Sequence, residues 1–120
     1  MSYKVLEKEV SENGEKVIIK TYEEYNDLNK LTNRYSKKNN LLEGSFEIYR
    51  RNGSNFLKTN YKKGFIDGEY IEWYDNGNVY IDCYIKGDEI ISYKIYNYDG
   101  ELLNKSLDEK MLAIYDLFDF

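Results

Sequence analysis

The chain has 120 residues and a net charge of −5, with 42% hydrophobic residues, which suits one compact domain over residues 1–120. The acidic balance excludes a general nucleic-acid binder, and a single cysteine cannot form an internal disulfide. No segment has the length and apolarity of a membrane span or a signal peptide. We expect a soluble cytoplasmic protein that binds neither nucleic acid directly nor a membrane.

The composition is poor in catalytic groups. The sequence contains no histidine, so it lacks the usual general base near neutral pH, the commonest zinc ligand and any histidine-based triad. Its carboxylates do not have the spacing of a calcium loop. Cys83 alternates with Ile81 and Ile85, which predicts a buried structural thiol. We therefore expect no enzyme activity, no catalytic residue, no metal site and no cofactor.

The N-terminal segment, residues 1–22, predicts a β-hairpin. Tyr3–Val10 and Lys16–Tyr22 are two strand-like runs on either side of Asn13-Gly14. An Asn-Gly pair between two such runs is the strongest short signal for a hairpin turn. The hairpin is expected to extend the sheet formed by the residues that follow.

Residues 20–103 contain an internal repeat. The segment Gly44–Gly53 recurs 24 residues later as Gly68–Gly77, and a third copy runs from Ile91 to Gly100. The third position of each copy is aromatic, as is the sixth, and the tenth is glycine. The aromatic positions are Phe46, Tyr70 and Tyr93, then Tyr49, Trp73 and Tyr96.

A degraded first copy is a possible reading of the residues that begin at Lys20. Tyr22 and Tyr25 occupy the aromatic positions there, and Asn29 replaces the glycine. Asparagine is the natural substitute where a turn requires a positive φ angle. Residues 23–37 also have the apolar spacing of a short helix, so the sequence leaves a helix and a degenerate repeat open.

Each copy has the pattern of a β-hairpin. Asn52-Gly53, Asn76-Gly77 and Asp99-Gly100 are expected to form two-residue turns, and a second set of turn residues stands at Asn40, Gly64 and Gly87. Strands that alternate with tight turns predict a mainly β fold, an antiparallel β-meander of three to four hairpin repeats.

The C-terminal segment, residues 106–120, predicts a capping α-helix. Ser106 and Glu109 form a capping box, and an apolar stripe follows at helical spacing. The stripe consists of Leu107, Met111, Ile114, Tyr115 and Phe118. Such a helix would protect an edge or a face of the open sheet.

The repeat resembles the MORN repeat, and more closely the bacterial MORN-variant proteins of the YwqK-type antitoxin family. The residues that carry the resemblance are Gly68–Gly77, Tyr61–Gly64 and Tyr84–Gly87. It covers residues 40–103 well and residues 20–39 poorly. The resemblance implies a protein-binding module without catalytic residues, in some cases one that neutralises a toxin.

The candidate partner-binding surface combines tyrosines with carboxylates. Tyr80 and Tyr84 fall opposite the aliphatic residues of their strand, and tyrosine is favoured at protein interfaces. Residues 61–120 hold 13 acidic and 6 basic side chains, against 9 and 11 in residues 1–60. The predicted surface consists of Glu69, Glu72, Tyr74, Asp75, Tyr80, Asp82 and Tyr84. Packing within the repeats is the alternative role for these tyrosines.

The sequence thus favours a non-enzymatic inhibitor of the antitoxin or immunity type. It would occlude a basic surface on a partner protein, such as the nucleic-acid groove of a nuclease. A phage-encoded inhibitor of a bacterial defence system would use the same physics. A structural protein that self-associates through its sheet edges is a further alternative.

Overall fold

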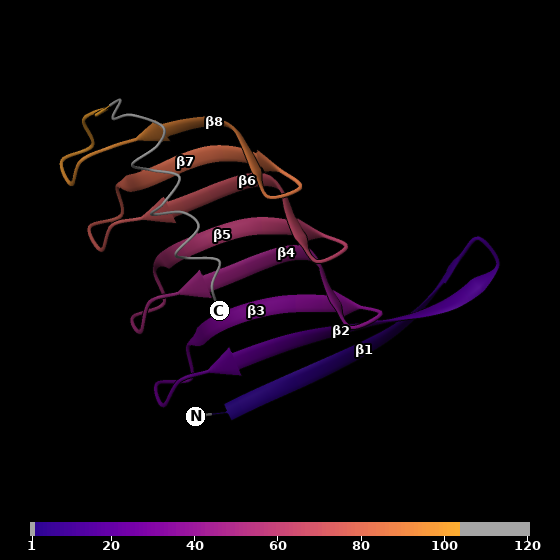
Figure 1. The fold of residues 1–120 in the computed structure, drawn as a ribbon. Coiled ribbons are helices and arrows are strands. Elements are labelled where there is room, and N and C mark those ends of the chain that lie inside the picture. The colour runs from indigo at the N-terminus through magenta and orange to yellow at the C-terminus, as the bar shows by residue number, and fades with distance from the viewer. Residues whose placement is uncertain (1, 104–120) are drawn as a thin grey trace.

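A computed structural model describes residues 2–103 as one open sheet of eight antiparallel strands (Figure 1). Each strand pairs with its neighbour in the sequence, so the predicted meander is confirmed. The strands are β1 (Ser2–Glu12), β2 (Glu15–Tyr25), β3 (Leu31–Lys38), β4 (Leu41–Tyr49), β5 (Asn55–Lys62), β6 (Phe65–Trp73), β7 (Val79–Lys86) and β8 (Glu89–Ile95). No helix occurs within residues 2–103, and the helix predicted for 106–120 lies outside the described residues.

Residues 23–37 contribute to strands β2 and β3, so the helical alternative for this segment is wrong. Tyr22 lies directly opposite Tyr35, and their ring centroids are 5.1 Å apart in a stacked arrangement. Asn29, in the turn between the two strands, has a φ of 59°, as expected for a residue in place of the repeat glycine. The degraded first copy therefore folds like the others.

The two faces of the sheet differ in chemistry. One face, called the apolar face here, carries a row of side chains that lie opposite one another from β2 to β8. The row consists of Tyr22, Tyr35, Phe46, Thr59, Tyr70, Cys83 and Tyr93. Neighbouring rings touch, with 5.9 Å between the centroids of Tyr35 and Phe46. The other face, called the polar face, carries mostly charged and polar side chains.

The hydrophobic core lies on the apolar face of strands β5–β8. Its members alternate with exposed residues along each strand, as expected for a sheet with one buried face. The buried cluster consists of Leu57, Tyr61, Ile66, Tyr70, Ile81, Cys83, Ile85 and Ile95. Cys83 is 3% exposed and makes no disulfide, as predicted.

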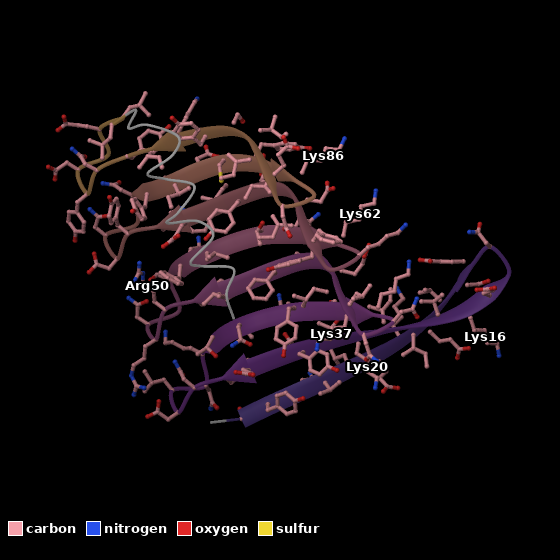
Figure 2. The ribbon with its side chains drawn as sticks, viewed as in Figure 1. Lys16, Lys20, Lys37, Arg50, Lys62 and Lys86 are labelled. Atoms are coloured by element: carbon pink, nitrogen blue, oxygen red, sulfur yellow. The ribbon has the colours of Figure 1, made fainter. Side chains whose placement is uncertain are left out.

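One end of the sheet is made of two-residue turns in which both central residues have positive φ. These are Asn13-Gly14, Asn39-Asn40, Lys63-Gly64 and Gly87-Asp88. Turns of this kind match the right-handed twist of the strands that they join. Figure 2 shows Lys62 and Lys86 at this end of the sheet, whereas Arg50 lies at the opposite end.

The opposite end, called the turn rim here, is made of four equivalent five-residue turns. They span residues 26–30, 50–54, 74–78 and 97–101, at spacings of 24, 24 and 23 residues. In each, the N–H of the fourth residue donates to the carbonyl of the first, and the first N–H donates to the carbonyl of the fifth. The prediction of two-residue turns at Asn52-Gly53, Asn76-Gly77 and Asp99-Gly100 is therefore wrong. Each rim turn begins with a four-residue β-turn whose fourth residue is left-handed, a glycine in three turns and Asn29 in the first, and this residue forms a bulge beside the strand.

Side chains link each turn of the rim to the next. The Asn26 amide donates to the carbonyl of Arg51 at 2.9 Å, and the Arg50 guanidinium donates to the carbonyl of Trp73 at 2.7 Å. The Tyr74 hydroxyl donates to the carbonyl of Tyr96 at 2.8 Å. These hydrogen bonds join equivalent parts of successive copies and form a continuous series along the rim.

Substitution of Gly77 would test how much the left-handed position of the rim turn contributes to stability. A Cβ atom at Gly77 would meet no atom within 4 Å, and its φ is +90°, so a substitution strains only the backbone. We expect Gly77→Ala to lower the free energy of unfolding by about 1–2 kcal/mol, as measured by urea denaturation. Gly77→Asn should cost less, because Asn29 occupies the equivalent position. Equal losses for the two variants would contradict this explanation.

Candidate functional site

Three of the seven predicted site residues come together on the polar face. Glu69 of β6 lies directly opposite Tyr84 of β7, and Asp82 lies two residues before Tyr84 on the same side of the strand. Tyr84 is 45% exposed, and both carboxylates are exposed. Antiparallel pairing therefore places an aromatic ring and two acids on one accessible surface.

Glu72 is not part of this surface, contrary to the prediction. It is 7% exposed and lies on the apolar face, where it pairs with Leu57 and Ile81 of the neighbouring strands. Burial raises the pKa of its carboxyl group, which is 3.4 Å from the Tyr70 hydroxyl. Aligning the copies would have revealed this, because Glu72 occupies the position that Ile48 and Ile95 hold in the other copies.

Tyr74, Asp75 and Tyr80 belong to the turn rim or to the strand end beside it. The Tyr74 hydroxyl donates a hydrogen bond to the carbonyl of Tyr96. The centroid of the Tyr74 ring lies 4.8 Å from that of Tyr80 and 5.4 Å from that of Tyr98. Tyr74 and Tyr80 therefore support the rim, and replacing Tyr74 should disturb the fold. Asp75 is exposed, and the hydrogen bond from Tyr98 to Asp75 raises the pKa of that tyrosine.

Two shallow hollows extend the surface on the polar face, and the sequence reasoning missed most of the residues that line them. The polar-face residues that line the first, of about 460 Å³, are Lys58, Asn60, Glu69, Ile71 and Trp73. Those that line the second, of about 230 Å³, are Glu69, Asp82, Tyr84, Ser92 and Lys94. Glu69 stands between them, so together they form one continuous surface, called the binding face here. The feature of the sequence that could have identified these residues is the alternation of Glu69, Ile71 and Trp73 along one strand.

The binding face carries both signs of charge. Asp82 lies opposite Lys94 in the sheet, and Ile71 separates Asp82 from Lys58 along the same cross-strand row. Acidic residues instead gather on the last two turns of the rim, at Asp75, Asp99 and Glu101. The negative charge of the C-terminal half is therefore spread over two surfaces, and the binding face is less acidic than expected.

An ion pair occupies the N-terminal part of the polar face. An Arg34 guanidinium nitrogen lies 2.6 Å from a carboxylate oxygen of Glu23, which is 5% exposed. The hydrogen bond from Arg34 lowers the pKa of Glu23. A second guanidinium nitrogen is 4.0 Å from Glu47. Glu23 and Arg34 are therefore paired with each other within the sheet.

The described residues offer little chemistry for catalysis. Burial raises the pKa of Cys83 to about 12, so its thiol remains protonated near neutral pH. Within residues 2–103, no group of three or more Cys, Asp or Glu side chains is placed to hold a metal ion. The described chain also contains no helix that is long and apolar enough to cross a membrane.

Comparisons with known proteins identify no relative. No family model, no curated protein and no solved structure matches the chain. The resemblance to MORN-type repeats stays a prediction.

The buried carboxyl of Glu72 predicts a pH dependence of stability. Because its pKa is raised above 4.5 in the folded state, the folded chain holds this proton more tightly than the unfolded chain. The contribution of Glu72 to stability is complete below pH 4.5 and is lost as the pH rises through the folded pKa. We expect Glu72→Gln to unfold at higher urea concentration than the parent at pH 7.5, with a smaller difference near pH 4.5. A difference that does not change with pH would contradict the burial of an ionisable group there.

Proposed function

We propose that this protein is a non-enzymatic, cytoplasmic protein-binding module that inhibits a partner by occlusion, as an antitoxin or immunity protein does. The observation that carries the proposal is the binding face, where Glu69, Asp82 and Tyr84 adjoin the hollow beside Trp73. The same occlusion would serve a phage-encoded inhibitor of bacterial defence.

The chemistry of the binding face favours protein contact. Tyrosine and tryptophan are the side chains most enriched among residues that dominate binding energy. Both stand here on paired strands in the middle of a sheet, so little conformational entropy is lost on binding. Glu69 and Asp82 would meet basic side chains of the partner, and Lys58 and Lys94 would orient it.

We extend the proposal to the repeats and to the C-terminal segment. We take the four equivalent copies as MORN-like repeats that form the scaffold, and residues 106–120 as the helix that caps it. The scaffold explains why the binding residues lie on strands and why the rim residues Tyr74 and Tyr80 are structural.

A partner can be identified by affinity purification from the native host or from infected cells, followed by titration of the purified pair. We expect one partner with a basic surface, bound near one-to-one, whose activity falls in proportion to the inhibitor added. Asp82→Lys and Tyr84→Ala should each raise the dissociation constant about tenfold, the usual loss when a central interface residue is removed.

Glu15→Lys is the matched control for Asp82→Lys. It makes the same change of charge at an exposed position beside the first two-residue turn, away from the binding face. It should bind like the parent. Equal binding by Asp82→Lys, Tyr84→Ala and the parent would exclude the binding face as the site of contact.

Self-association is the second candidate, favoured by the open edges of the sheet. Within the described chain, β1 and β8 each have a paired strand on one side only, and Ile91 of β8 is 58% exposed. Exposed strand edges pair readily with other strands. A defined oligomer in light scattering at low micromolar concentration, lost in Ile91→Lys, would favour self-association. A monomer throughout would contradict self-association.

A further inference from the structure

The apolar face of β5–β8 is more completely buried than one layer of strands provides. Ile81, Ile85 and Ile95 are 0% exposed, and Tyr70 is 1% exposed. Neighbouring strands cover the flanks of a side chain, but its tip points away from the sheet. A tip that is shielded from water requires a second layer packed on that face.

The strands themselves do not supply this layer. All eight lie in a single sheet, and each contacts chiefly its neighbours in the sequence. The burial is also local, because Ile18 of β2 lines a hollow beside Tyr22 and is 51% exposed. Whatever covers the apolar face is therefore confined mainly to the C-terminal strands.

The chain beyond residue 103 starts beside the buried region. The Leu103 N–H donates to the carbonyl of Ile95 at 2.7 Å, and Leu102 forms a bridge with Tyr96. We propose that the apolar stripe of residues 106–120 is the layer that covers the apolar face of β5–β8. The stripe residues Leu107, Ile114 and Phe118 would pack against the buried isoleucines and Tyr70. This inference does not depend on the proposed inhibitor function.

The length of the segment fits the surface that it must cover. A helix over residues 106–120 would be about 22 Å long, at 1.5 Å per residue. The distance from β8 to β5 is three strand spacings, about 14 Å, and from β8 to β3 about 24 Å. The segment therefore spans the buried strands and ends near β3 and β4.

Charge complementarity favours the same direction. Asp116 and Asp119 stand at the end of the predicted helix, where negative charge is unfavourable unless a cation lies close. Figure 2 shows Lys20 and Lys37 close together at β2 and β3. Lys37 Nζ lies 5.9 Å from the centroid of the Tyr22 ring, on the apolar face. The acidic end of the segment would therefore meet the basic end of this face.

Cys83 reports directly on this layer, because it is the only cysteine in the chain and lies on the buried face. In the full-length protein, we expect Ile114→Asp to accelerate the reaction of Cys83 with a thiol reagent at least about tenfold, since an uncovered thiol ionises more readily. Ala113→Asp is the matched control. It introduces the same charge one residue earlier, on the opposite side of the predicted helix, and should react like the parent.

Trp73 fluorescence and the far-UV circular dichroism of the strands should remain as in the parent, because Trp73 lines a hollow on the polar face. If Ile114→Asp fails to fold, Phe118→Ala provides the milder variant and should still react measurably faster. Equal rates in the folded stripe variants, Ala113→Asp and the parent would overturn the proposal. A parent rate that falls as protein concentration rises would overturn it too, since a second copy would then cover the face.

Discussion

Register between neighbouring strands is the constraint on which this structure depends. Every strand pairs with its neighbour in the sequence, so the seven short turns between the eight strands decide how each strand is aligned. A shift by one residue would move every side chain of a strand to the other face. The conformation of each turn therefore determines the alignment of the strands that it joins. Two-residue turns with positive φ close one end of the sheet, and β-turns whose fourth residue is left-handed close the other.

This register gives the sheet two faces that differ in chemistry. The apolar face aligns aromatic rings from Tyr22 to Phe46 and the buried side chains of β5–β8. The polar face leaves Tyr84 and the hollow beside Trp73 accessible. The side chains that form the core therefore project from one side of each strand, and the exposed residues Glu69, Asp82 and Tyr84 project from the other.

The candidate site was predictable in part. Glu69, Asp82 and Tyr84 follow from simple alternation, and the structure places them side by side. Glu72 and Tyr74 were misplaced for different reasons. Glu72 is a carboxylate in a core position of the repeat, and a polar residue type does not reveal that its neighbours bury it. Tyr74 sits where a hydroxyl reaches the carbonyl of Tyr96, 22 residues away, a contact that no local pattern encodes.

The sequence by itself determined the meander and the positions of the turns, and it left three or four copies open. Glycine and asparagine are favoured where φ is positive, so their regular spacing marks the turns, and alternating strands leave few other folds. Only the tertiary structure decided the type of the rim turns, the face of Glu72 and the mixture of charges around Asp82. These depend on bulges and on cross-strand neighbours, which bring together residues that are far apart in the chain.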